Sequence, residues 1–251
     1  LSTDAAGSTT LAADITTSGD QHYGDALTLD TSPTPSPAGG VRFAGSIGGP
    51  HTLTTDAAGT TFDGTVSLAA LDVQQAATIN GGSVATTGSQ HWGGAVALGA
   101  DTTFAGSTVT FDAGVSGAHA LTLNADTTLH DDINTTGAQS YGGTLTLAGD
   151  VRLTSDGSIG FTGSVTGPHA LTLDATGGTN FGGAVSIASL DVLRAASLGN
   201  ATITTSGAQH WRGALGLIGN ATLTSTGGGL LRFDGAIDGP GALTANTAGT
   251  T

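Results

Sequence analysis

Internal repetition is the feature that most constrains this sequence, because a self-similar chain builds its core by stacking copies of one unit. The segment from Ile133 to Leu147 recurs at residues 15–29, 84–98 and 203–217. Each copy contains the pattern Thr-Ser/Thr-Gly-x-Gln-x-aromatic. All four Tyr and Trp residues of the chain occupy its aromatic position, at Tyr23, Trp92, Tyr141 and Trp211.

A second segment follows each copy of the first. Residues 41–53, with the pattern Val-x-Phe-x-Gly, match residues 109–121, 159–171 and 231–243, which places Phe43, Phe111, Phe161 and Phe233 at one repeat position. A third segment, residues 62–73, returns once, at residues 181–192. The interval between successive Tyr and Trp positions is long, then short, then long again, so long and short blocks alternate. We therefore expect two super-repeats of about 120 residues, residues 1–120 and 121–251, within one continuous array.

The composition indicates an all-β chain. Of 251 residues 43 are Gly, all 19 acidic residues are Asp, and Met and Lys are absent. Thr and Val favour the pleated surface of a sheet, and Gly, Asp and Asn favour turns. Regular apolar positions and a hydrophobic fraction of 37% argue against disorder.

The spacing of apolar residues predicts a parallel β-solenoid with roughly 17–20 residues per rung. Short alternating stretches such as Leu145-Thr-Leu147 place Leu inward and Thr outward. Strands this short need neighbours above and below, which a coil of three strands and three turns provides. An antiparallel sandwich or propeller is the alternative fold, but the repeat unit is short for a blade. We expect the eight repeated aromatic residues to be packing anchors: Tyr23, Trp92, Tyr141, Trp211, Phe43, Phe111, Phe161 and Phe233.

Residues 31–40, Thr-Ser-Pro-Thr-Pro-Ser-Pro-Ala-Gly-Gly, depart from the repeat. They replace the strand-like Val151–Ser155 of the second super-repeat. Since proline cannot donate to a ladder, we predict a surface loop or an interrupted strand here.

The charge and the amino-acid content exclude several classes of function. A net charge of −14 would repel a polyphosphate, so nucleic-acid binding is not expected. The chain has no Cys, hence no disulfides and no thiolate metal sites. No apolar run reaches the roughly 18 residues that a membrane-spanning helix needs, so no transmembrane segment is expected. Matching phases at the two ends suggest a window cut from a longer array.

The repeated phrases, together with Leu98-Gly-Ala-Asp-Thr-Thr103, resemble the repeats of filamentous-haemagglutinin-like adhesins, which are very large secreted bacterial exoproteins. The resemblance covers essentially the whole chain. It implies a right-handed parallel β-helix, export to the bacterial cell surface or the extracellular space, and a shaft that presents adhesive elements.

Histidine and aspartate are the candidates for chemistry. His22, His91 and His210 precede the repeated aromatic residue, but they lie several rungs apart and are most simply surface residues copied with the repeat. The Asp residues form no cluster that stands out from the repeat, and the five Arg residues are scattered along the sequence. We therefore expect no catalytic site, no metal site and no cofactor, so the chain is not expected to be an enzyme. Weak calcium binding at Asp turns stays open.

Two functions remain. The first is a structural or adhesive stalk of a large secreted bacterial surface protein, whose partners would be glycans or receptors on a host or neighbouring cell. The second is a protomer of an extracellular filament or matrix fibre, formed by end-to-end stacking of solenoids. In that case the partner would be another copy of the chain, since exposed strand edges invite pairing.

Overall fold

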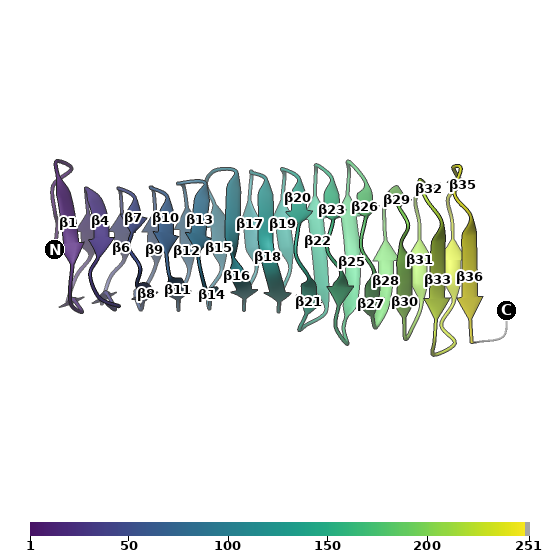
Figure 1. Ribbon diagram of the computed structural model, residues 1–251, viewed down its shortest axis with the longest axis horizontal. Helices are drawn as coiled ribbons and strands as arrows, with labels where there is room; N and C mark the ends of the chain where they lie inside the picture. The colour runs from purple at the N-terminus through teal and green to yellow at the C-terminus, as the bar shows by residue number, and fades with distance from the viewer. Residues whose placement is uncertain (249–251) are drawn as a thin grey trace. The chain divides into compact units, whose positions relative to one another are not determined.

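The computed structural model describes residues 1–248, and all regular secondary structure in this range is β-strand. All the described strand pairings are parallel, and a rung takes roughly 19 residues. The chain is therefore a β-solenoid, as predicted, and the antiparallel alternative is wrong (Figure 1). It divides into two compact units, Leu1–Asp126 and Thr127–Thr251, with the boundary inside strand β18 (Leu121–Leu129).

In the first unit the strands stack in three columns, each named here by its first strand. The β1 column contains β1 (Ser8–Leu11), β4 (Ala26–Leu29), β7 (Ile47–Gly48), β10 (Val66–Leu68), β13 (Ser83–Thr86) and the first half of β16 (Thr102–Phe111). The β8 column contains β8 (Thr52–Thr55), β11 (Ala70–Val73), β14 (Ser89–Trp92) and the second half of β16. The β3 column contains β3 (Gln21–Tyr23), β6 (Val41–Phe43), β9 (Thr60–Phe62), β12 (Ala77–Ile79), β15 (Val96–Leu98) and β17 (Val115–Gly117). A short pair, β2 (Thr16–Thr17) and β5 (Ser36–Pro37), completes the unit.

The second unit also has three columns. The β19 column contains β19 (Ile133–Thr135), β22 (Val151–Ser155), β25 (Ala170–Ala175), β28 (Ser189–Val192), β31 (Gln209–Trp211) and β34 (Leu231–Phe233). The β20 column contains β20 (Gln139–Tyr141), β23 (Ile159–Phe161), β26 (Thr179–Phe181), β29 (Ala196–Leu198), β32 (Leu215–Leu217) and β35 (Ile237–Asp238). The β21 column contains β21 (Leu145–Leu147), β24 (Val165–Thr166), β27 (Val185–Ile187), β30 (Thr202–Thr205), β33 (Ala221–Ser225) and β36 (Leu243–Thr247), and the last residues of β18 pair with β21.

The length of a rung varies with its turns. In the β3 column Thr60 pairs with Ala77, whereas in the β21 column Ala221 pairs with Leu243, several positions further along the chain. Apolar residues that follow one another in the sequence also change column. Ile79 pairs with Leu98 in the β3 column, whereas Trp92, which lies between them in the sequence, belongs to the β8 column.

Alternating side chains build the core, since successive residues of a strand face opposite sides of the sheet. In the β3 column the inward position is filled successively by Tyr23, Phe43, Phe62, Ile79 and Leu98, which are register neighbours. Their exposures are 4% or less. Each such side chain contributes roughly 1.5–3 kcal/mol by leaving water, so the rungs stabilise one another through contiguous interior contacts.

The proline-rich segment continues the coil without a regular strand. Ser32–Pro35 lie outside any strand, as predicted, but Pro33, Pro35 and Pro37 are buried rather than on the surface. The intervening residues keep their donors: Ser36 N and Ala38 N bond to carbonyls of the preceding rung. Because proline occupies every second position, only the donors that would point to the other neighbouring rung are lost.

A Gly-Pro turn in three copies of the second repeat segment requires glycine. Gly49, Gly167 and Gly239 have φ values of 133°, 133° and 129°, in the left-handed region. A Cβ at these residues would lie 2.3–2.6 Å from a carbonyl oxygen of the preceding rung. Glycine is therefore required at this turn both for its positive φ and because a side chain would clash with the preceding rung.

Candidate functional site

The first and second repeat segments form two consecutive rungs. In all four copies the Gln-x-aromatic of the first segment lies in register with the Val/Ile/Leu-x-Phe of the second. The aromatic pairs are Tyr23 and Phe43, Trp92 and Phe111, Tyr141 and Phe161, and Trp211 and Phe233. Seven of these eight side chains are at most 3% exposed, and Phe233, in the last such pair, is partly buried. The rings of Tyr141 and Phe161 stack with centroids 5.1 Å apart.

Three of the four repeated glutamines, Gln90, Gln139 and Gln209, join neighbouring rungs from inside the core, whereas Gln21 donates to Ile15 O and Thr17 Oγ1 of its own segment. Gln139 is 1% exposed, and its Nε2 donates to Thr135 Oγ1 at 3.1 Å and to the Thr154 carbonyl of the next rung at 2.7 Å. Its Oε1 accepts a hydrogen bond of 2.9 Å from the hydroxyl of Tyr141. Burial raises the pKa of this tyrosine, so the hydroxyl remains a donor. We call this arrangement the glutamine clamp.

The tryptophan copies of the clamp are less well satisfied. Gln209 Nε2 still donates to the carbonyls of Ile203 and Thr224, at 3.3 and 3.0 Å. Its Oε1 and Trp211 Nε1 are both buried and lack a hydrogen-bond partner, and the same is true of Gln90 and Trp92. The indole N–H of Trp does not reach the glutamine Oε1 to which the phenol hydroxyl of Tyr donates. The Tyr copies of the clamp therefore satisfy more of their buried polar atoms.

The copies of the motif lie on different sides of each unit. Tyr23 belongs to the β3 column and Trp92 to the β8 column, and Tyr141 and Trp211 likewise belong to the β20 and β19 columns. The interval from Tyr23 to Trp92 is not a whole number of rungs, because a rung takes roughly 19 residues. The repeated Tyr and Trp residues therefore do not form a single ladder along one face.

Two of the three motif histidines, His91 and His210, make ion pairs with Asp residues of the neighbouring rungs, whereas the buried Nε2 of His22 has no hydrogen-bond partner among the described residues. His91 lies between Asp72 and Asp112, with Nδ1 and Nε2 each 2.8 Å from a carboxylate oxygen. Hydrogen bonds to Asp112 and then to Asp72 raise the pKa of His91 above its ordinary value, against the smaller effect of desolvation. Within residues 1–248 no three His or Asp side chains lie together so as to hold a metal ion.

The Asp turns of the chain bond to neighbouring rungs. Asp132 Oδ1 accepts the backbone N–H of Arg152 at 2.7 Å, and Asp150 and Asp101 do the same for Ala170 and Ala120 at 2.9 Å. These carboxylates replace backbone acceptors at the corners of the coil, which accounts for Asp at turns without a ligand.

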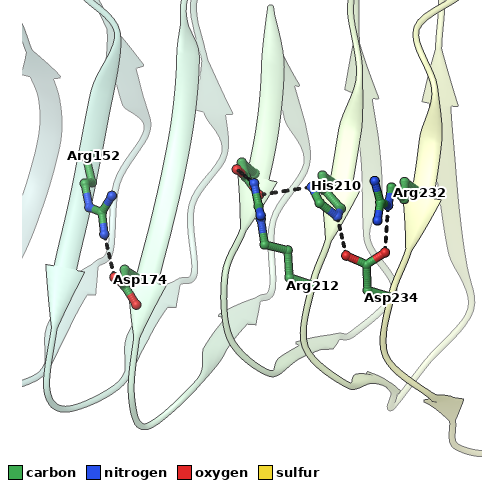
Figure 2. Close-up of polar contacts among 7 residues, drawn as sticks. Arg152, Asp174, His210, Arg212, Arg232 and Asp234 are labelled. Carbon is green, nitrogen blue, oxygen red and sulfur yellow. Dashed lines mark hydrogen bonds and ion pairs between the residues drawn. The ribbon is translucent and has the colours of Figure 1, made fainter.

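The arginines are not scattered in space, which corrects the interpretation from the sequence. Four of the five belong to the β19 column or the turns that follow its strands, and we call them the arginine ladder: Arg152, Arg194, Arg212 and Arg232. Figure 2 shows Arg152, Arg212 and Arg232 with their surroundings. The signal was present in the sequence, since Arg194, Arg212 and Arg232 follow one another at intervals close to one rung each. Charge spacing at the rung length, read against the repeat, would have found it.

Carboxylates alternate with the arginines. Asp174 bonds Arg152 and Arg194, at 2.5 and 2.9 Å, and Asp191 bonds Arg212 through two nitrogens at 2.9 and 2.8 Å.

At the end of the ladder, Asp234 bonds Arg232 at 2.7 Å and His210 at 2.6 Å. Hydrogen bonds from Arg194 and Arg232, respectively, are the leading cause that lowers the pKa of Asp174 and of Asp234. The charge network thus favours the ionised form of these two carboxylates.

Comparison with known proteins yields no match to a family model, a curated protein or a solved structure. Across residues 1–248 no helix long and apolar enough to span a membrane is found. The features available for a functional argument are therefore the stacked core, the glutamine clamps and the arginine ladder.

Proposed function

We propose that this chain is part of the structural, adhesive stalk of a large secreted bacterial surface protein, and that it is not an enzyme. The observation that supports this proposal is the connection of successive rungs within each unit by backbone ladders, reinforced at some rungs by aromatic stacks and glutamine clamps inside. A load applied along such a stack is shared by three columns of parallel hydrogen bonds. The solenoid thereby acts as a stiff spacer for elements carried elsewhere on the protein.

Deletion of whole rungs from the gene product that contains this sequence tests the proposal. Removing residues 23–97 joins His22 to Leu98, which lies in the same column four rungs from Tyr23, so the register is preserved. We expect the cell-surface projection to shorten by roughly 19 Å, at about 4.8 Å per rung, in cryo-electron tomograms. Antibodies against this segment should label intact cells. An unchanged projection, or labelling only after cell lysis, would refute the stalk.

A filament protomer is the second candidate. The observation that favours it is the parallel pairing of successive rungs, because a stack of this kind can be continued by a further copy of the chain. Regular head-to-tail filaments of the isolated chain in negative-stain electron micrographs would favour the filament over the spacer.

A further inference from the structure

The charge of the chain is unevenly distributed. Residues 157–234 contain three Asp, Asp174, Asp191 and Asp234, and three Arg, so this stretch is formally neutral in a chain whose net charge is −14. All three carboxylates are already bonded to arginine. Exposed charges interact weakly beyond a Debye length of about 8 Å at physiological salt, so the distant Asp residues do little to repel an anion that approaches this stretch.

Within the arginine ladder the cations lie outside the anions. The side chains of Arg194, Arg212 and Arg232 are 57%, 49% and 59% exposed, whereas their partners Asp174, Asp191 and Asp234 are 16%, 31% and 34% exposed. The carboxylates hold the guanidinium groups in place from below. What solvent meets first is therefore a set of ordered guanidinium groups.

Two of these guanidinium groups keep their terminal nitrogens available as donors. Among the contacts of the described residues, Arg194 and Arg232 use only Nε, bonded to Asp174 and Asp234 at 2.9 and 2.7 Å. Both terminal nitrogens of each can still donate, in the planar fork that fits a carboxylate or a sulfate. The matching geometry is already visible at Arg212, which holds the carboxylate of Asp191 through two nitrogens.

The spacing of the arginines suits an extended ligand. Arg194, Arg212 and Arg232 come from three consecutive rungs, since β28 pairs with β31 and β31 with β34. Rungs are about 4.8 Å apart, so the three arginines are spread along the direction of stacking. They lie at different positions across the column, Arg232 within β34 and Arg194 and Arg212 just after β28 and β31. A linear chain with an acidic group on successive units could contact them together, and several weak contacts then add up.

We propose that the arginine ladder is a binding site for a linear acidic polysaccharide, of the kind that carries uronate carboxylates. A nucleic acid fits the surface less well, because single-stranded binding uses exposed aromatic rings as stacking platforms. All four Tyr and Trp side chains of the chain are at most 2% exposed. This binding role goes beyond the stalk function and does not depend on it.

Binding of fluorescently labelled polygalacturonate to the 251-residue chain, measured by anisotropy at low and at high salt, tests the proposal. We expect saturable binding that weakens as salt rises, and roughly tenfold weaker binding by the double variant Arg194→Gln/Arg232→Gln, which is about 1.4 kcal/mol. Arg42→Gln is the matched control, since Arg42 is 59% exposed and bonds a single Asp through Nε, outside the ladder. It should bind as the unaltered chain does, and circular dichroism checks that each variant is folded.

Four results would overturn the proposal. The first is the absence of polygalacturonate binding to the folded, unaltered chain at low salt. The second is an equal loss in the Arg42 control, which would indicate general charge attraction. The third is tighter binding of a single-stranded oligonucleotide than of polygalacturonate. Dextran sulfate, used as a second probe, distinguishes sulfate from carboxylate groups: tighter binding of dextran sulfate would contradict the uronate assignment.

Discussion

Removing one glutamine clamp should destabilise the second unit by an amount that the structure lets us work out. Gln139→Leu keeps most of the side-chain volume but removes three hydrogen bonds, to Thr135 Oγ1, the Thr154 carbonyl and the Tyr141 hydroxyl. A buried polar group left without a partner costs about 1–3 kcal/mol. One such group, the Tyr141 hydroxyl, is orphaned, because the Thr154 carbonyl lies in the ladder between β19 and β22, and the leucine gains some transfer energy. We expect a net loss of about 1–3 kcal/mol in the free energy of unfolding.

A double-mutant cycle separates the clamp from general damage to the core. Tyr141→Phe alone leaves Gln139 Oε1 unpaired, which should cost about 1–3 kcal/mol. In the variant with both changes no hydroxyl is orphaned, so the loss should be smaller than the sum by about 1–2 kcal/mol. Gln209→Leu is the internal control, because its Oε1 has no partner to lose and its Nε2 bonds are longer. It should cost less than Gln139→Leu.

Urea unfolding followed by the fluorescence of Trp211 measures these differences in the second unit. A Trp92→Phe background removes the tryptophan of the first unit, so that only the second unit is observed. Additive losses in the double variant, or a Gln139→Leu chain as stable as its parent, would refute the reasoning that the glutamine links the rungs.

Three further changes are expected to have measurable effects. Because its folded pKa is raised, the stabilisation by His91 should be complete below its ordinary pKa and should be lost as the pH rises through the folded value; thermal melts from pH 5 to 9, compared with those of His91→Asn, check this. Phe181→Ala should cost about 3–5 kcal/mol in urea titrations, and Phe233→Ala distinctly less, since Phe181 is 1% exposed and Phe233 only partly buried; equal losses would contradict the burial. Gly167→Ala should destabilise by more than the roughly 1 kcal/mol that an Ala substitution gains elsewhere, because its φ is 133° and its Cβ would lie 2.3 Å from Leu147 O; an unchanged melting temperature would show that the turn can relax.

The class of fold follows from the sequence. Alternation such as Leu-Thr-Leu predicts an inward and an outward face, and a chain rich in Gly, Asp and Asn predicts a turn every few residues. Tyr141 and Phe161, predicted as packing anchors, are buried and stacked. The two predicted super-repeats divide at residue 120, close to the boundary between the compact units at Asp126 and Thr127.

The register between rungs could not be predicted from the sequence, because it depends on the summed lengths of the turns. Rungs differ in length, so the motif that contains Tyr23 arrives in another column when it recurs at Trp92. The same summation brings Arg152 and Arg194 together at Asp174, although the two arginines are far apart in the sequence. The sequence alone determined that the chain coils and which side chains point inward, since these depend on neighbouring residues. Which outward side chains meet was decided only in the tertiary structure, where each rung sets the position of the next.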